Sequence, residues 1–193
     1  MTDVPLTATD PLPFRPRRIL VTGCSGSGKT TLAAALATRL GLPHHELDAL
    51  FHGPAWVPRP TFVADVTALA ATECWVVEWQ YSHVRPLLLA RAELLVWLDL
   101  SRTRVFAQLL RRTVVRRLRG VELWNGNYEP PLRTLFTDRD HIIRWSWRTH
   151  RQRERDALAV ARQVNGPNVV RLVGQAQVDA WVRGPLRALA SSR

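Results

Sequence analysis

Residues 23–30 read Gly-Cys-Ser-Gly-Ser-Gly-Lys-Thr and match the pattern GxxxxGK(S/T) at every fixed position. Glycines let successive backbone N–H groups curl around a phosphate group, and a lysine offers a compact ammonium to phosphate oxygens. The chain has 27 lysines and arginines, and Lys29 is the single lysine among them. The one basic residue that is not arginine therefore stands where this chemistry requires a lysine. The pattern also assigns the Thr30 hydroxyl to Mg²⁺. The expected nucleotide contacts are Gly23, Ser25, Gly26, Ser27, Gly28, Lys29, Thr30 and Thr31.

A strand and a helix must hold such a loop in place, and the flanking residues predict both. Residues 17–22 contain the apolar run Ile-Leu-Val and are typical of a buried strand that enters the loop. After the loop, Leu32, Leu36 and Leu40 recur at a spacing of four, which predicts a helix with one apolar face, and Gly41 is suited to end it. The N-terminus of this helix adds N–H donors and partial positive charge at the phosphate site.

The remaining sequence alternates between apolar runs and helical patterns. We expect strands at 44–48, 75–78, 94–99 and 169–173. One helix is expected to start near residue 61, and four more are expected at 82–91, 101–118, 139–164 and 176–190. This alternation predicts an α/β fold of the P-loop NTPase type, with a parallel sheet of about five strands and helices on both faces. Asp48, Glu78 and Asp99 each end an expected strand, at the edge of the sheet where ligands bind in such folds.

Composition limits the class of protein. With 193 residues and 46% hydrophobic content, we expect one domain over residues 17–193, preceded by a proline-rich flexible leader over 1–16. No apolar run approaches the length of a membrane span, and the leader lacks the pattern of a signal peptide. Two cysteines give no disulfide framework, which favours a cytoplasmic location. The sequence does not indicate an oligomeric state.

Most of the excess positive charge lies in one segment. The net charge is +11, and residues 102–162 carry 15 arginines against six acidic residues, which indicates an anionic partner. Arg112 and Arg116 precede an irregular segment at 119–137 that we expect to form a lid over the phosphates. Arg148 and Arg151 share one face of the next expected helix. Two interpretations of that face stay open: a phosphate clamp that supports catalysis, or an exposed basic surface.

Some classes of phosphate-loop protein are excluded. A switch GTPase reads guanine with (N/T)KxD, and the chain has no second lysine to complete that motif. The length is small for the core of a motor ATPase. What remains is the compact kinase branch, in which an arginine-rich lid closes over the phosphates.

Several segments together carry a resemblance that spans roughly residues 18–173: the phosphate loop, 47–51, Trp56, 75–78, 81–82 and 122–127. In these segments the chain resembles the adenylate-kinase-related bacterial family of topology-modulation proteins, in particular its actinobacterial members. The resemblance implies a nucleotide-kinase fold, ATP with Mg²⁺ as cofactors, and phosphoryl transfer to an acceptor. The acid at Asp48 is then expected to orient Mg²⁺ or an acceptor hydroxyl. Glu78 is a candidate for the shell of Mg²⁺, together with Thr30, or for the base that accepts a hydroxyl proton.

The acceptor site is expected to contain aromatic residues. Trp56, Trp79 and Trp124 fall in predicted site loops, where they either stack on a planar acceptor or are buried under a loop. The resembled family usually has glycine where this chain has Trp79, so we expect a narrowed pocket. The remaining expected acceptor contacts are Phe51, Tyr81 and Arg85.

The expected function is an ATP-dependent phosphotransferase that acts on a small molecule, such as a nucleoside, a nucleotide or a related metabolite. Two alternatives follow from the basic segment 102–162: a kinase of nucleic-acid ends, and a non-catalytic nucleotide-dependent protein that binds DNA or a protein partner. Binding to nucleic acid that weakens steeply with salt would favour these alternatives.

Overall fold

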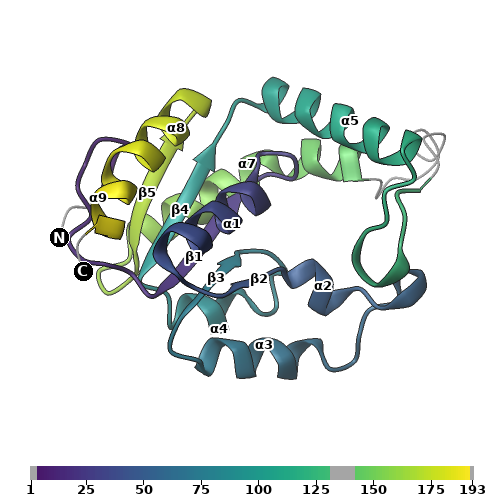
Figure 1. Ribbon diagram of the computed structural model, residues 1–193, viewed down its shortest axis with the longest axis horizontal. Coiled ribbons are helices and arrows are strands. Elements are labelled where there is room, and N and C mark those ends of the chain that lie inside the picture. The colour runs from purple at the N-terminus through teal and green to yellow at the C-terminus, as the bar shows by residue number, and fades with distance from the viewer. Residues whose placement is uncertain (1–3, 131–141, 192–193) are drawn as a thin grey trace.

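Five short strands form the centre of the molecule. The computed structural model describes residues 4–130 and 142–191. The strands are β1 (Arg18–Gly23), β2 (His44–His45), β3 (Trp75–Glu78), β4 (Leu94–Asp99) and β5 (Asn168–Val173). Every neighbouring pair is parallel, and the order across the sheet is β2-β3-β1-β4-β5 (Figure 1). This confirms the predicted parallel sheet of about five strands.

Helices connect the strands and cover both faces of the sheet. They are α1 (Lys29–Leu40), α2 (Leu47–Phe51), α3 (Phe62–Ala71), α4 (Arg85–Leu89), α5 (Arg102–Leu118), α7 (Ile142–Ala161), α8 (Gln175–Arg183) and α9 (Pro185–Ser191). Successive side chains of a strand point to opposite faces. Ile19 and Val21 therefore pack against α1, α8 and α9, whereas Leu20 packs in a second cluster with α3, α4 and the C-terminal part of α7.

Three expectations about these elements differ from the structure. The second strand is only two residues long, so Asp48 lies in the first turn of α2 and does not end a strand. The last expected helix is divided into α8 and α9 at Gly184, because Pro185 lacks the N–H that a continuous helix needs. Residues 4–16 do not extend away from the domain: Leu6 pairs with Val170 of β5, and Ala8 is buried.

Two small hairpins lie beyond the sheet edge at which the strands end. Loop 52–58 contains a 3₁₀ turn at Pro54–Trp56 and a bridge between His52 and Pro58. Hairpin 122–128, which follows α5, contains a 3₁₀ turn at Trp124–Gly126 and a bridge between Glu122 and Tyr128. The chain after α5 thus descends to meet the loop after α2 (Figure 1). Within the described ranges, no helix is long and apolar enough to cross a membrane.

Candidate functional site

The phosphate loop joins β1 to α1 and depends on glycine at two positions. Gly26 and Gly28 have φ angles of +90° and +92°, a left-handed conformation that glycine adopts without strain. At Gly26, an added Cβ atom would lie 2.7 Å from the Cβ atom of Leu109 on α5, so the packing of α5 also requires glycine. The N–H group of Ser27 donates to the Cys24 carbonyl at 3.0 Å and closes the turn.

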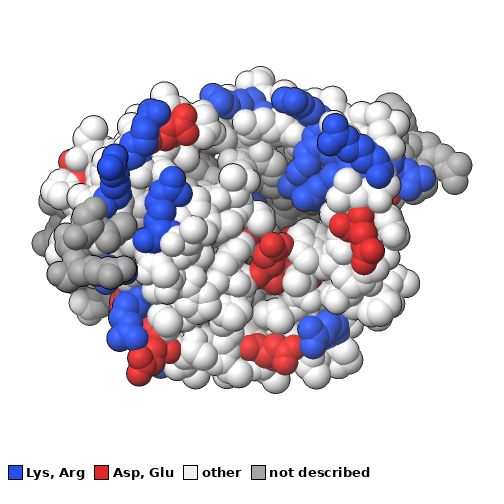
Figure 2. Space-filling view, viewed as in Figure 1, with Lys and Arg blue, Asp and Glu red and all other residues white. Residues whose placement is uncertain are grey.

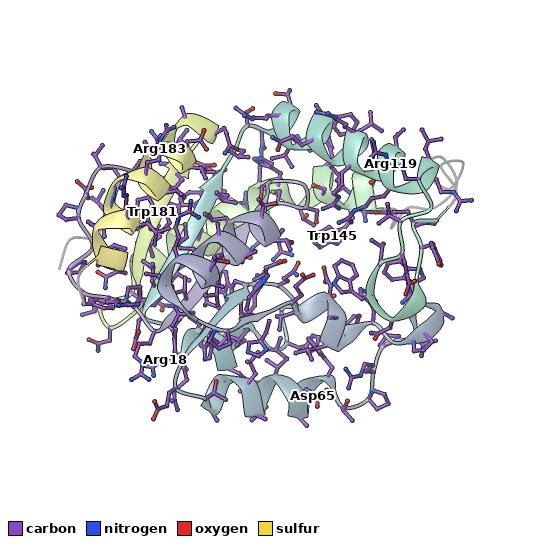
Figure 3. All side chains as sticks on the ribbon, viewed as in Figure 1. Arg18, Asp65, Arg119, Trp145, Trp181 and Arg183 are labelled. Atoms are coloured by element: carbon purple, nitrogen blue, oxygen red, sulfur yellow. The ribbon has the colours of Figure 1, made fainter. Side chains whose placement is uncertain are left out.

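A cleft of about 1130 Å³ opens at the carboxyl ends of the strands, next to this loop. A site for one drug-sized ligand occupies about 300–1000 Å³, so the cleft has room for a nucleotide and a second molecule. Its walls come from the phosphate loop, the region after β3, α2, both hairpins, α5 and α7. In Figure 3, Trp145 of α7 lies between the upper and lower parts of the molecule, and it lines the cleft.

Lys29 and Glu78 are both buried at the floor of the cleft. The Lys29 ammonium donates to the Cys24 carbonyl at 3.1 Å. Burial lowers the pKa of Lys29, and the nearby carboxylates of Glu78 and Asp48 oppose this effect. Burial likewise raises the pKa of Glu78, while Lys29 and a hydrogen bond with Thr30 oppose the rise. Each charge therefore offsets part of the desolvation of the other.

Asp48, Tyr81 and His52 form a hydrogen-bonded chain on the wall opposite the arginines of α5. The Tyr81 hydroxyl donates to Oδ1 of Asp48 at 2.5 Å, and Nε2 of His52 lies 3.2 Å from the same hydroxyl. Burial, and then the Asp48 charge, raise the pKa of Tyr81, so the phenol keeps its proton and orients the carboxylate. Burial lowers the pKa of His52, so this imidazole stays neutral near pH 7. Asp48 is thereby held with one face toward the cleft.

Arginines of α5 form the opposite wall. Arg112 and Arg116 both line the cleft. Burial lowers the pKa of Arg112, and so does the neighbouring charge of Arg116. The buried carboxylate of Glu129 lies 3.6 Å from Arg116, and the Glu129 carbonyl accepts a hydrogen bond from Arg117 at 3.3 Å. A single carboxylate next to two guanidinium groups leaves an excess of positive charge toward the cleft, as a phosphate site requires.

Hairpin 122–128 is joined to loop 52–58 by the Asn127 side chain. Its amide oxygen accepts the N–H of Trp56 at 2.9 Å, and its amide nitrogen donates to the Gly53 carbonyl at 2.9 Å. Nearby, the Trp124 indole donates to Glu46 at 2.7 Å. These contacts connect α2, the loop that follows it and the hairpin into one wall of the cleft.

No protein-family model matches the chain. A gluconokinase of Gluconobacter oxydans (strain 621H) is 56% identical over 46 residues, which are 24% of this chain and 25% of that protein. The chain thus matches only about a quarter of the length of this curated relative.

Solved structures match over most of the chain. A gluconokinase from Sinorhizobium meliloti 1021 has a TM-score of 0.50 at 20% identity and covers 92% of this chain and 93% of its own. The chain has the fold of the P-loop kinases. A shikimate kinase from Bacteroides thetaiotaomicron has a TM-score of 0.48 at 20% identity, with 87% of this chain and 95% of that chain covered.

This P-loop kinase fold brings most of the predicted residues to one cleft. The residues that line it include, from the predicted set, Ser25, Lys29, Thr30, Asp48, Phe51, Trp56, Glu78, Tyr81, Arg112, Arg116 and Trp124. Four others, Gly23, Gly26, Ser27 and Gly28, belong to the backbone of the loop, and Thr31 is exposed on α1. The roles of all these residues stay predictions.

Four predicted contacts lie elsewhere. Trp79 is buried, and its indole donates to the Arg85 carbonyl at 3.3 Å. The Arg85 guanidinium lies 4.7 Å from the centre of the Trp79 ring and pairs with Asp156 of α7 at 2.6 Å. Neither residue lines the cleft, so their placement does not support the predicted acceptor contacts. Arg148 and Arg151 are exposed on α7 and do not line it either, so their placement does not support the predicted catalytic contact.

Two further expectations can be compared with the structure. The Asp99 carboxylate is bonded to Arg171 of β5 at 2.8 Å and lies outside the cleft, so it stabilises the pair of strands β4 and β5. The expected lid at 119–137 is described to residue 130, and its first part is the hairpin hydrogen-bonded to loop 52–58. Residues 131–137 lie outside the described residues.

Sequence reasoning missed several residues of the site. Glu46, His52, Glu129 and Arg153 all line the cleft. Glu46 could have been found, because it lies two positions before Asp48 in the same run. Asn127 had the Asn-Gly-Asn turn as a local signal, but its contacts are made with a loop 71 positions earlier, which no local pattern encodes.

Proposed function

We propose that this protein is an ATP-dependent kinase that transfers the γ-phosphate to a hydroxyl group of a small molecule. The observation that carries the proposal is the convergence of the phosphate loop and the oriented carboxylate of Asp48 on one cleft. The gluconokinases among the compared proteins support a small-molecule acceptor. The finer resemblance to topology-modulation proteins remains part of the proposal, because the compared proteins do not carry it.

The residues fit a magnesium ion that accompanies ATP. Oε1 of Glu78 is buried without a hydrogen-bond partner in the described structure, and the Thr30 side chain is adjacent to this carboxylate. Carboxylate and hydroxyl oxygens are ligands that Mg²⁺ accepts, directly or through water. When bound with ATP, the ion would neutralise charge on the β- and γ-phosphates.

The proposed reaction assigns a role to each wall of the cleft. The oxygen of the acceptor hydroxyl bonds to the γ-phosphorus, and Asp48 accepts the proton of that hydroxyl. Tyr81 holds the Asp48 carboxylate in position. The bond between the γ-phosphorus and the bridging oxygen breaks, and ADP leaves with the electron pair. Lys29, Arg112 and Arg116 face the charge that develops on the phosphate oxygens.

The basic segment 102–162 suggested two alternatives that involve nucleic acid. Arg112, Arg116 and Arg153 of this segment line the cleft, so part of its charge belongs to the proposed phosphate site. The gluconokinases reported above are named for a small-molecule acceptor and not for a nucleic acid. Binding of single-stranded and duplex DNA at two salt concentrations tests the alternatives directly.

Replacement of Lys29 tests the proposed activity. We expect Lys29→Ala to lower acceptor-dependent ADP formation by the folded protein by about two to three orders of magnitude, because one preorganised charged donor is lost. Lys29→Arg should also have low activity, because the planar guanidinium group does not replace the compact ammonium group. Arg39→Ala, at an exposed site on the same helix, is the control. A Lys29→Ala variant that keeps most of its turnover would contradict the kinase proposal.

A further inference from the structure

The wall of the cleft that faces the α5 arginines is built from segments without a single lysine or arginine. The chain carries 27 of these residues among 193, yet none lies in 43–58, 73–84 or 120–130. These three segments supply most of the residues that line the cleft. The cations of the described cleft, Lys29, Arg112, Arg116 and Arg153, lie instead on the phosphate loop, α5 and α7.

The same wall carries a concentration of carboxylates. Glu46, Asp48 and Glu122 line it, and Glu78 lies at the floor of the cleft beside Lys29. Figure 2 shows the division: arginine side chains gather over the C-terminal half of α5, and acidic groups lie below them, across the hollow. Because the chain as a whole has a net charge of +11, this wall has the opposite sign to the rest of the protein.

Three arginines flank these segments, namely Arg59, Arg85 and Arg119; Arg119 directly follows α5 and does not line the cleft. Arg59 pairs with Asp65 of α3 at 3.2 Å, and Arg85 pairs with Asp156 of α7 at 2.6 Å. Neither lines the cleft. His52, which does, is kept neutral near pH 7 because burial lowers its pKa. An acidic group that entered this wall would therefore meet carboxylates and no compensating lysine or arginine of the wall.

Aromatic rings complete the wall. Phe51, Trp56 and Trp124 line the cleft beside the carboxylates, and the Trp124 and His52 rings lie within 25° of parallel. Aromatic faces bind the apolar C–H surface of a sugar or cyclitol ring, while carboxylates accept hydrogen bonds from its hydroxyl groups. Like charges brought together at a binding site repel each other, which is an effective means of rejecting a wrong ligand.

We propose that the acceptor is a polyhydroxylated compound without an acidic group, either neutral or amine-bearing, and that this wall rejects the corresponding acids. The inference rests on the proposed kinase activity and adds the class of its acceptor. It separates this chain from the acid substrate implied by the name of the compared gluconokinases.

A panel of matched acceptors tests this inference with the full chain and Mg²⁺-ATP. Each set shares one skeleton: a hexitol, its aminodeoxy analogue and the hexonate, then a cyclitol, an aminocyclitol and a cyclitol carboxylic acid. We expect kcat/KM for the neutral or amine member to exceed that for the acid by about tenfold or more. A preference for the acid would overturn the acceptor class and leave the kinase proposal intact. Binding of ATP without turnover of any member would also count against the class, whereas failure to bind ATP would overturn the kinase proposal itself.

A charge reversal on the wall tests the cause of the selectivity. Glu122 is exposed and lines the cleft, so Glu122→Lys should fold and should raise the kcat/KM ratio of acid to neutral acceptor by about three- to tenfold. Glu73→Lys makes the same change at an 82% exposed side chain outside the cleft and should leave the ratio unchanged. An unchanged ratio in Glu122→Lys, or an equal change in both variants, would contradict selection by the charge of the wall.

Discussion

The side chain of Asn127 takes the place of a backbone partner for Trp56, which lies 71 positions earlier in the chain. One amide group satisfies the Trp56 N–H and the Gly53 carbonyl, and it also bonds the Trp124 carbonyl at 2.8 Å. The side chain is only 3% exposed, so water cannot replace these bonds. Asn127 therefore joins the two hairpins, together with the Asn125 amide, which donates to the His52 carbonyl.

Replacement of Asn127 by alanine should loosen the contact between the two hairpins. The backbone groups at Gly53 and Trp56 would lose their partner, and we expect a loss of about 1–3 kcal/mol in the free energy of unfolding. Hydrogen exchange should increase at 52–58 and 122–128 in particular. Asn165→Ala, at an exposed turn, is the control for the chemical change. Unchanged exchange in both hairpins would show that the contact does not hold them together.

Asp48→Asn should lower kcat by about a hundredfold if the acceptor is a hydroxyl, because the proton then lacks a base. Tyr81→Phe keeps the carboxylate and removes only its hydrogen-bond donor, so a smaller loss is expected, with ATP affinity unchanged. Steady-state kinetics with the best acceptor of the panel measure both. Full activity of Asp48→Asn, with the loss seen only in Glu78→Gln, would assign the base to Glu78.

The buried carboxyl of Glu78 should make stability depend on pH. Burial raises the pKa of Glu78 above its ordinary value of 4.5, so between these two pKa values the folded protein binds more protons than the unfolded chain. The free energy of unfolding contributed by this group therefore falls as pH rises through that interval. Glu78→Gln should gain stability relative to the natural protein as pH rises above 4.5, measured by urea unfolding. A difference that is constant with pH would contradict this.

Cys24 should be unreactive although it lies in the phosphate loop. Its side chain packs with Leu100 and Val105, and burial raises the pKa of its thiol to about 11. Because the thiolate is the reactive form, alkylation by iodoacetamide at pH 8 should be slower at Cys24 than at the half-buried Cys74. Mass spectrometry of the labelled peptides distinguishes the two. Faster labelling of Cys24 would mean that the loop opens in solution.

The parts of the fold that follow local patterns could be predicted from the sequence. The glycine spacing of the phosphate loop and the apolar runs located β1, β3, β4 and β5. The apolar runs of β3 and β4 also place Trp75 and Trp97 in the core, where they are at most 2% exposed. The periodicity of neighbouring residues predicts these elements, and the packing of the folded protein agrees with the local pattern.

The cleft wall could be predicted only in part, because its contacts join distant segments. Trp79 directly follows β3 and was expected at the pocket, but its ring turns away to pack on Arg85. Glu129 pairs with Arg116 of α5, and this contact depends on the path that the chain takes after hairpin 122–128. Neither placement has a signature in spacing or composition, since both are decided by packing between elements.

The pairing of Leu6 with Val170 has a consequence for how copies of the protein behave toward one another. β5 is the last strand of the sheet, and its outer N–H and C=O groups would otherwise be open to a strand from another molecule. The Leu6 N–H donates to the Val169 carbonyl at 2.7 Å, and the Leu6 carbonyl accepts from Arg171 at 2.8 Å. The proline-rich segment thus occupies the edge at which sheets of two copies could join, and it opposes aggregation there.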